Sequence, residues 1–510
     1  MSLKIGEVYK ISNRYLEAVH NKDIFSKPVS SDNGLNIIGM LNSYVSIPLF
    51  NSQNAIGIIF EQLDPVKEKE ISFSPKIEMI ISKIRLIGTY DPLYKKFKRG
   101  IDFFPTLNSD VFAIDEKELE EIYNSTINHN SATLQIGNDI HHGQVKIYTD
   151  PNILLGKHCA VFGNTGSGKS CTVTSILQGI YLNNKNRLLN AKKKHLKTII
   201  IDSNDEYSNI FNENGSKPDW VVSKNYAELE LSHKDLSFYE LTQLLQENSP
   251  NVIPYLKIAV MKLKKTPNVD EKKYYEFSKL PEEIVNAISQ KKGNSAKDDF
   301  VIGFLKHIIM RIEYFCSDER FDAVFNKSGN SIEDFLKSDT QKVLILSLKV
   351  PNDTLALFIY MISKSIFDFK SDTANRKKDN ILLVLEEAHR YITTITTDQM
   401  NNYYIDKLAR EGRKFGVNLM VSTQRPSEVS NTLISQCNSL IAHKITNIRD
   451  LEFIKNTIEY DDKSQIDSLS GLKQQQALVL GEAFAFSSLV KIAEANPLPQ
   501  SETPKIFTNE

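Results

Sequence analysis

The sequence predicts an α/β protein built from a small β-rich part, a larger α/β part and a helical insertion. Two observations lead to this fold class. Residues 1–150 hold short runs rich in Ile and Val, broken by Asn, Asp, Ser, Gly and Pro, with no long helix between them. From Pro151 onward, apolar runs alternate with helical stretches. We therefore expect a small barrel or sandwich over 1–150, and an α/β domain over 151–510.

The composition is that of a globular protein. Apolar residues make up 41% and charged residues 25% of the 510 residues, which excludes a mostly disordered, collagen-like or membrane-spanning chain. Lys and Arg (62) nearly balance Asp and Glu (63), so the formal net charge is −1. Nucleic-acid-binding proteins more often show an excess of basic residues, so this balance alone does not indicate one.

The cysteines and the N-terminus predict where the protein works. Cys159, Cys171, Cys316 and Cys437 lie far apart with no CxxC spacing, so neither a disulfide framework nor a zinc site is expected. The first twenty residues lack an apolar core of the signal-peptide kind, and no window approaches 18 consecutive apolar residues. We expect a cytoplasmic protein that has no contact with the membrane.

Five apolar runs near the N-terminus are the predicted strands of the small β-rich part. They are short and closely spaced, which is typical of a barrel or a sandwich. The runs cover 3–11, 35–41, 43–50, 55–62 and 76–90.

Seven further apolar runs are the predicted strands of the α/β domain. They are almost continuously apolar, which favours a parallel sheet covered on both faces, in a core of the nucleotide-binding kind. The runs cover 158–163, 197–202, 342–348, 380–387, 416–423, 439–445 and 475–481. Between about 226 and 339 such runs are few, and 235–248 and 300–315 have helical spacing, so we expect a helical insertion there.

A phosphate-binding loop is predicted at residues 163–170, which read GNTGSGKS and match GxxxxGK[ST]. An apolar strand precedes the motif and a helical stretch follows it, as the mechanism requires. Glycines let several main-chain N–H groups face one phosphate, and the helix N-terminus adds its positive dipole. Lys169 would reach the β- and γ-phosphates, and Ser170 would coordinate Mg²⁺. No segment resembles a guanine-binding one, so ATP is the expected nucleotide. The predicted contacts are Gly163, Asn164, Thr165, Gly166, Ser167, Gly168, Lys169, Ser170 and Cys171.

A pair of acids is predicted at the end of the strand in NILLVLEEAH, residues 380–389. A P-loop enzyme needs one carboxylate near Mg²⁺ and often a second one that orients the attacking water. We assign Glu386 to the metal, usually through water, and Glu387 to the water. The alternative is two surface glutamates at the start of a helix, where the dipole favours negative charge. Asp202 also ends a predicted strand, and a turn or cap is as well supported there as a role near the nucleotide.

Residues 409–426 carry the remaining candidates, in the stretch AREGRKFGVNLMVSTQRP. Arg410 and Arg413 lie about one helical turn apart, so both can face the same way. Either could stabilise charge on the transferring phosphoryl group, often from a neighbouring subunit, or form a surface ion pair with Glu411 or Asp406. Gln424 ends a predicted central strand, where an amide either contacts the γ-phosphate or attacking water or is simply satisfied locally.

These three blocks together resemble the HerA branch of the HerA–FtsK superfamily of P-loop translocases, over about residues 151–500. The resemblance implies a RecA-like P-loop core, and the first 150 residues are similar in placement to the family's HAS barrel. It further implies a hexameric ring that hydrolyses ATP, with Mg²⁺, and moves double-stranded DNA through its channel. The ATP site would lie between subunits, with Arg410 or Arg413 acting in trans. Glu386 replaces the commoner Asp, which bears on metal geometry.

The resemblance also implies a partner and leaves alternatives open. HerA-like proteins usually work with a second activity, such as a NurA-type nuclease in DNA end processing, or a nuclease or sirtuin-like NADase in anti-phage defence. One alternative is a ring scaffold that assembles a partner enzyme and uses ATP for regulation with little translocation. Another is a secretion or conjugation coupling ATPase, which the absence of a predicted transmembrane helix disfavours. A ring needs positive charge only on its inner wall, so a net charge of −1 is compatible with DNA.

Overall fold

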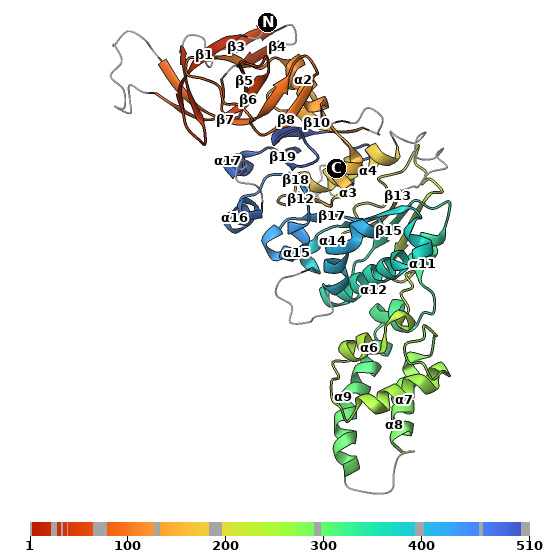
Figure 1. Ribbon diagram of the computed structural model, residues 1–510. Helices are drawn as coiled ribbons and strands as arrows, with labels where there is room; N and C mark the ends of the chain where they lie inside the picture. Colours follow the sequence, from red (N-terminus) through yellow and green to blue (C-terminus); the bar gives the residue numbers. More distant parts are fainter. Residues whose placement is uncertain are drawn as a thin grey trace, which may run out of the picture. The chain divides into compact units, whose positions relative to one another are not determined.

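The structure is a computed structural model that divides into two compact units (Figure 1). Unit 1 comprises Met1–Asn190, Met420–Ser427 and Ile434–Glu510, and unit 2 comprises Ala191–Leu419 and Glu428–Leu433. The residues that the structure describes are 3–21, 28–31, 34–37, 39–64, 79–125, 127, 133–182, 196–289, 297–392, 402–457 and 463–500. Among them, no helix has both the length and the apolar character that crossing a membrane requires.

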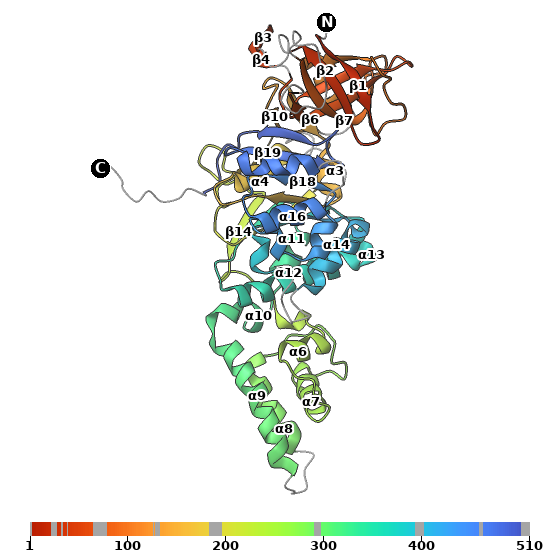
Figure 2. The same cartoon turned by 90° about the vertical axis from the view of Figure 1, so that its left-hand side faces the viewer.

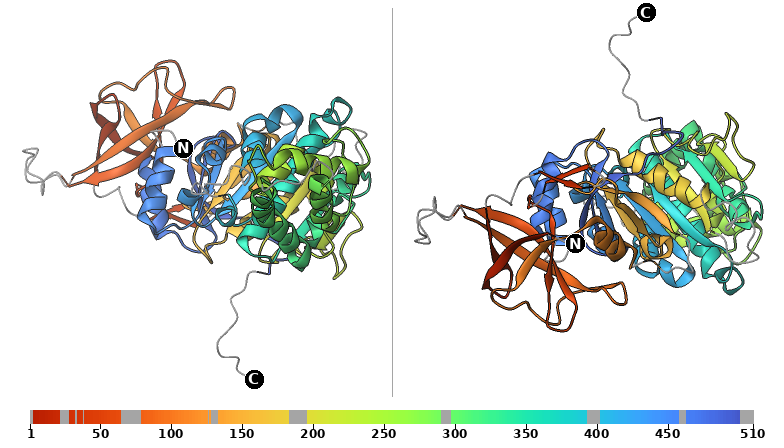
Figure 3. Two further views of the ribbon diagram at one scale, coloured as in Figure 1. Left: turned by 90° about the horizontal axis from the view of Figure 1, so that it is seen from below. Right: turned by 90° about the horizontal axis from the view of Figure 1, so that it is seen from above.

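Unit 1 begins with a closed β-barrel. The antiparallel ring runs β1-β9-β5-β6-β7-β2, and pairing of β2 with both β1 and β7 closes it, while β8 adds to β7. Of the two predicted possibilities, barrel and sandwich, the structure is a barrel (Figure 3). The strands are β1 (Lys4–Ile11), β2 (Leu16–Asn21), β5 (Tyr44–Pro48), β6 (Asn54–Leu63), β7 (Met79–Asp91), β8 (Lys96–Arg99) and β9 (Asp110–Ala113).

The barrel is held together by an apolar core to which every strand of the ring contributes. Alternate side chains of a strand point to opposite faces, so each strand can turn one apolar set inward. A separate hairpin, β3 (Pro28–Ser31) with β4 (Gly34–Ile37), and helix α2 (Glu116–Asn124) accompany the barrel. The core includes one fully buried residue from each strand of the ring: Val8, Leu16, Ile47, Ile59, Ile84 and Val111.

The rest of unit 1 is a mixed sheet. Its parallel part confirms the prediction: β12 (Cys159–Phe162) lies between β17 (Val417–Thr423, in unit 1 from Met420) and β18 (Ser439–Ala442). The prediction of a parallel strand at 475–481 is wrong, because β19 (Gln476–Gly481) runs antiparallel to β18. The reason is that β19 starts at the carboxyl end of β12, where the Gln475 N–H donates to the Ser167 carbonyl at 3.0 Å.

Three more antiparallel strands extend this sheet beyond β19. They are β20 (Ser488–Ile492), β10 (Leu134–Asp139) and β11 (Lys146–Thr149), in that order. Strands β10 and β11 fall inside the range 1–150, yet they pair with β20 and not with the barrel. The helices of this part are α3 (Pro151–Gly156), α4 (Lys169–Tyr181), α16 (Ile448–Thr457) and α17 (Lys463–Ile466), while α15 (Asn431–Ser435) is divided between the two units (Figures 1 and 2).

The β19–β20 loop attaches the barrel to this sheet. The Arg99 guanidinium donates to the main-chain carbonyls of Gly481, Phe484 and Ala485 at 2.7, 2.9 and 2.8 Å. The ring of Phe486, in the same loop, packs against barrel aromatic residues, with ring centroids 5.0 Å from Tyr44 and 5.6 Å from Phe97. Five donors in a rigid guanidinium can satisfy several carbonyls at once, which explains an arginine here.

Unit 2 is built on a parallel sheet, as predicted. The strand order is β16-β13-β15-β14, and all three neighbouring pairs are parallel. These strands are β13 (Leu196–Asp202), β14 (Val221–Asn225), β15 (Val343–Ser347) and β16 (Asn380–Leu385), with helices α12 (Asn352–Ser371), α13 (Thr373–Arg376) and α14 (Tyr403–Phe415). Short 3-10 turns of the two units lie at 233–235, 277–279, 319–321, 388–390, 426–428 and 467–471.

The helical insertion is present where the sequence predicts it, between β14 and β15 (Figure 1). Its aromatic core forms around Phe325, whose ring centroid lies 4.5 Å from that of Phe277 and 4.9 Å from that of Phe315. The helices are α6 (Phe238–Leu244), α7 (Ile253–Lys264), α8 (Leu280–Ser289), α9 (Lys297–Ser317), α10 (Asp322–Phe325) and α11 (Ser331–Lys337).

A buried polar network ties the first insertion helix to α12 and α14. Glu240 on α6 accepts from the hydroxyls of Tyr360 (2.6 Å) and Tyr404 (2.9 Å), and Lys364 Nζ lies 3.2 Å from its Oε2. Burial alone would raise the pKa of Glu240, but the bond from Tyr360 and the charge of Lys364 hold this pKa below its usual value. The charges are therefore paired inside the protein, where an unpaired charge is costly.

We predict that Lys364→Ala destabilises unit 2 by about 3–5 kcal/mol, because it leaves the Glu240 carboxylate buried without its cation. The matched control is Lys349→Ala, which breaks an exposed pair with Asp205 and should cost under about 1 kcal/mol. Urea unfolding measures both, and equal losses would contradict the assignment. Since the folded pKa of Glu240 is the lower one, its contribution is complete above pH ~4.3 and is lost as the pH falls through the folded value.

Candidate active site

The loop between β12 and α4 has the backbone that its glycines predict. Gly163, Gly166 and Gly168 have φ values of +155°, +74° and +113°, a region that other residues rarely adopt. A Cβ atom on Gly163 would lie 2.5 Å from Ser167 Oγ and 2.6 Å from His443 Cβ, so no side chain fits there. Helix α4 then begins at Lys169, so its N-terminus lies at the loop, which is the arrangement that binds phosphate.

A buried histidine packs against the phosphate-binding loop and helix α4. His443 follows β18, and its Nε2 lies 2.8 Å from Thr172 Oγ1 on α4, while its Nδ1 lies 2.9 Å from the Gln476 carbonyl. Burial lowers the pKa of His443 to about 4, and the charge of Lys169 acts in the same direction. The imidazole is therefore neutral at pH 7, with Nδ1–H donating to the carbonyl and Nε2 accepting from Thr172. No motif in the sequence marks this residue.

Two side chains at the carboxyl ends of neighbouring strands contact the loop. Gln424, just after β17, accepts at Oε1 from the Thr165 hydroxyl at 2.5 Å. Thr446, after β18, accepts from Asn164 Nδ2 at 2.9 Å. The structure thus brings Gln424 to the phosphate loop. Both a nucleotide sensor and a locally satisfied amide fit this contact, so the role of Gln424 stays a prediction.

The remaining loop residues fit a nucleoside triphosphate with Mg²⁺. Lys169 is buried, and its Nζ lies 3.4 Å from the Asn164 carbonyl, so the ammonium folds over the loop. Ser170 and Cys171 occupy the first turn of α4 and are partly exposed. A concave backbone that a Cβ would fill, a lysine beside it and a hydroxyl at the helix start together form a phosphate cradle. In such a cradle Ser170 would hold the metal.

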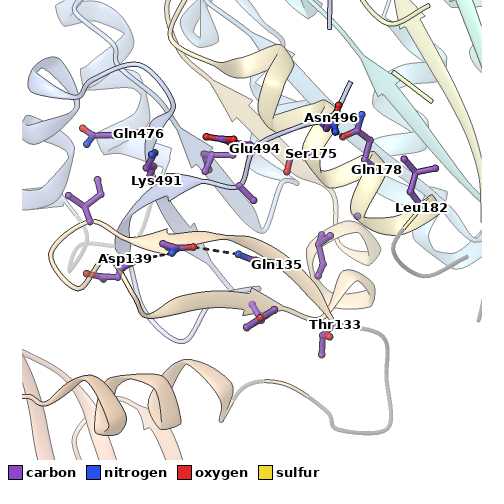
Figure 4. A pocket seen from close by; sticks show the side chains of 18 residues that line it. Thr133, Gln135, Asp139, Ser175, Gln178, Leu182, Gln476, Lys491, Glu494 and Asn496 are labelled. Carbon is purple, nitrogen blue, oxygen red and sulfur yellow. Dashed lines mark hydrogen bonds between the residues drawn. The ribbon is translucent and has the colours of Figure 1, made fainter. Parts of the chain in front are cut away.

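A polar cavity of about 1080 Å³ lies beside α4 (Figure 4). Ser175 and Gln178 from α4 line it, together with Gln476 and with Lys491 from β20. Gln178 is satisfied by the main chain, since its Nε2 donates to the Pro497 carbonyl at 2.9 Å. Gln476 also accepts from His443, so the cavity reaches residues that support the phosphate loop.

The predicted acidic pair lies in unit 2, directly after β16. Glu386 is 1% exposed, and its Oε2 accepts from the Tyr207 hydroxyl at 2.9 Å. The side chain of Glu387 is 12% exposed, and its Oε2 lies 3.3 Å from His389 Nδ1. The alternative of two surface glutamates at the start of a helix therefore does not fit this turn. The assignment of Glu386 to Mg²⁺ and of Glu387 to the attacking water stays a prediction.

Glu387 has a strained backbone, with φ +48° and ψ +47°. A left-handed conformation in a residue other than glycine costs about 1–3 kcal/mol and persists only where its surroundings hold it. Such strain is most common at active sites and switch regions, which agrees with a catalytic assignment. Directly after Glu387 the chain forms a 3-10 turn over Ala388–Arg390.

Asp202 has the contacts of a turn cap. Its carboxylate accepts from the main-chain N–H groups of Tyr207 (2.8 Å), Glu206 (3.0 Å) and Asn204 (3.3 Å). Burial nevertheless raises the pKa of Asp202, against the effect of these bonds. Of the two alternatives for this residue, the contacts match the cap.

Arg410 and Arg413 lie on α14, exposed to solvent. Among the described residues, neither guanidinium forms an ion pair within 4.0 Å, although the charge of Arg410 acts to lower the pKa of Asp406. Asp406 instead accepts from the Ser430 hydroxyl at 3.0 Å. Both arginines are thus open to a ligand or to another subunit.

The loop between β12 and α4, on a sheet with parallel neighbours, defines a P-loop ATPase. Residues 134–366 match the family model described as "Helicase HerA, central domain". The DNA double-strand break repair helicase HerA of Sulfolobus acidocaldarius is 25% identical over 482 residues, covering 90% of this chain and 86% of that protein. The same-named protein of Saccharolobus solfataricus is 24% identical over 443 residues, covering 81% and 80%. Over residues 134–366 and across most of its length, the chain is therefore similar to HerA-like P-loop ATPases of the HerA–FtsK superfamily.

A solved structure agrees with the fold. VirB4 of Thermoanaerobacter pseudethanolicus superposes with a TM-score of 0.51 at 14% identity, covering 73% of this chain and 99% of that one. At this identity the match concerns the fold alone, and it supports the P-loop core described above. The predicted resemblance to the HerA branch is confirmed.

We predict that Gly163→Ala lowers the affinity for ATP by about tenfold or more, because a Cβ there displaces Ser167 or His443. Gly471→Ala is the matched control, since its Cβ would meet no atom within 4 Å and its backbone needs no positive φ. Titration with a fluorescent ATP analogue measures both. Equal affinities in the two variants would show that the loop tolerates a side chain at 163.

Proposed function

We propose that this chain is an ATP-driven translocase or helicase acting on double-stranded DNA. The observation that carries the proposal is the phosphate cradle at Gly163–Lys169, in a chain whose relatives are named DNA double-strand break repair helicases. A strained acidic turn at Glu387 adds the second element that an ATP-hydrolysing motor needs.

The proposed chemistry assigns one task to each group. Main-chain N–H groups of the loop and Lys169 bind the β- and γ-phosphates, and Glu387 orients the attacking water and accepts its proton. Mg²⁺, held by Ser170 and by Glu386 through water, would neutralise charge on the phosphates. Gln424 contacts the γ-phosphate or the attacking water.

We further propose a homohexameric ring with ATP sites between subunits. Support comes from Arg410 and Arg413, which are exposed and form no ion pair in the described structure, as an arginine acting on a neighbouring subunit requires. DNA would pass through the ring, whose inner wall alone needs positive charge. The net charge of −1 is then compatible with DNA binding.

The barrel is the proposed docking site for a partner effector in the cytoplasm, a nuclease or a sirtuin-like NADase, in DNA end processing or anti-phage defence. The described part of the barrel exposes several large apolar side chains, and exposed apolar patches often mark sites of protein interaction. This observation also favours the alternative of a ring scaffold that activates a partner with little translocation. The exposed residues are Phe50, Leu93, Tyr94, Phe103, Phe104 and Leu107.

We predict that Lys169→Ala and Glu387→Ala each reduce ATP turnover by about a hundredfold or more, and that double-stranded DNA stimulates the wild type. The control is Lys337→Ala, an exposed residue of α11 paired with Glu333, which should keep wild-type turnover. Steady-state ATP hydrolysis with and without DNA measures all four proteins. Wild-type turnover in Glu387→Ala would refute the catalytic assignment, and hydrolysis indifferent to DNA would favour the scaffold.

A mixing experiment tests whether the site is shared between subunits. Lys169→Ala subunits mixed with Arg410→Ala or Arg413→Ala subunits should regain ATP turnover, because some interfaces then combine an intact lysine with an intact arginine. Mixing Lys169→Ala with Glu387→Ala is the control and should recover nothing if both groups serve the ATP of their own subunit. No recovery with either arginine variant would contradict action in trans.

A further inference from the structure

Two tyrosine hydroxyls hold the acidic turn after β16. The first belongs to Tyr207, which is 0% exposed and donates to Glu386 Oε2 at 2.9 Å. Burial and the nearby Glu386 raise the pKa of Tyr207 well above its usual value, so the phenol keeps its proton and acts as the donor. Within the described residues, Glu386 is the sole hydrogen-bond partner of this hydroxyl.

Tyr207 is itself held in place by the turn that Asp202 caps. The Asp202 carboxylate accepts from the Tyr207 N–H at 2.8 Å, five residues along the chain. Asp202 ends β13, and β13 pairs in parallel with β16, the strand that leads to Glu386. The main chain agrees, since the Glu386 N–H donates to the Ile201 carbonyl at 3.3 Å. The phenol thus approaches Glu386 from the neighbouring strand in a defined orientation.

The second hydroxyl belongs to Tyr391, which is 3% exposed and donates to the main-chain carbonyl of Glu386 at 2.9 Å. This bond spans the 3-10 turn and fixes the peptide between Glu386 and Glu387. Glu387 then takes its left-handed conformation, which is unfavourable unless neighbouring contacts hold it. A hydrogen bond to a buried carbonyl can supply a compensating contribution.

We propose that Tyr207 and Tyr391 are positioning residues for ATP hydrolysis. Tyr207 orients the carboxylate of Glu386, and Tyr391 holds the turn that aims the carboxylate of Glu387. The proposal rests on the proposed function, because it takes both glutamates as members of the hydrolytic site. Neither tyrosine touches ATP in this scheme, so binding of the nucleotide does not depend on them.

The test removes each hydroxyl with Tyr207→Phe and Tyr391→Phe, which keep the ring. We expect kcat for ATP to fall about tenfold to a hundredfold in each variant, since catalysis is sensitive to small displacements, while KM stays within about twofold. The matched control is Tyr90→Phe in the barrel, because Tyr90 is 2% exposed and its hydroxyl also donates to a carboxylate, that of Glu121 on α2. This control should keep the wild-type kcat.

The outcomes separate this proposal from the proposed function. If Glu387→Ala is inactive but Tyr207→Phe and Tyr391→Phe keep the wild-type kcat, the positioning roles are overturned and the proposed function stands. If Glu387→Ala keeps turnover, the catalytic assignment itself fails. A rise in KM with unchanged kcat also overturns the positioning roles, because it places the hydroxyls in nucleotide binding.

A second experiment tests the role of Tyr207 even if the Tyr207→Phe variant does not fold. Fluorotyrosine placed at 207 keeps the ring and the hydroxyl but makes the hydroxyl a stronger donor to Glu386. We expect kcat to change in a graded way with the number of fluorine atoms, at constant KM. An unchanged kcat across the series would overturn the role of Tyr207.

Discussion

Unit 1 depends on one steric constraint, which is that no side chain fits at residue 163. The space that a Cβ would need is taken by Ser167 and His443, so the loop and the end of β18 are in direct contact. The Gln475 N–H bonds the same loop at the start of β19, which obliges that strand to run antiparallel. Six residues later β19 ends at Gly481, where Arg99 holds the barrel. A single strand therefore connects the phosphate loop to the barrel.

Unit 2 depends on buried charges that are satisfied from within the protein. Lys197 donates to the carbonyls of Phe335 and Leu336 at the end of α11, and burial lowers its pKa to about 8. The Glu240–Lys364 pair and the Tyr207–Glu386 bond follow the same rule. Each burial costs free energy unless partners are supplied, so each fixes the elements that provide them. The insertion and the acidic turn are thus held to the parallel sheet by polar contacts as well as by apolar packing.

The sequence predicted local features, such as motifs and single strands, but not the pairing of strands that lie far apart in the chain. The phosphate loop could be predicted because its function needs particular residues at fixed spacing. The seven core strands could be predicted because burial on both faces makes them apolar throughout. The pairing of β10 with β20 joins segments more than three hundred residues apart, and no periodicity encodes it. His443 and Tyr207 act through single contacts, the latter with a residue 179 positions away, so no spacing marked them.

Some of the charged groups that enter the net charge of −1 are buried and paired inside the protein. The 62 basic residues include Lys197, whose ammonium caps a helix, and Lys364, which neutralises Glu240. The 63 acids include Glu386, which is enclosed with Tyr207. These groups are buried inside the protein, so their charges do not contribute to a surface that DNA could contact. The sum of −1 therefore carries no information about the wall of a channel, whereas Arg410 and Arg413 are exposed, form no ion pair within 4.0 Å among the described residues, and carry a local positive charge.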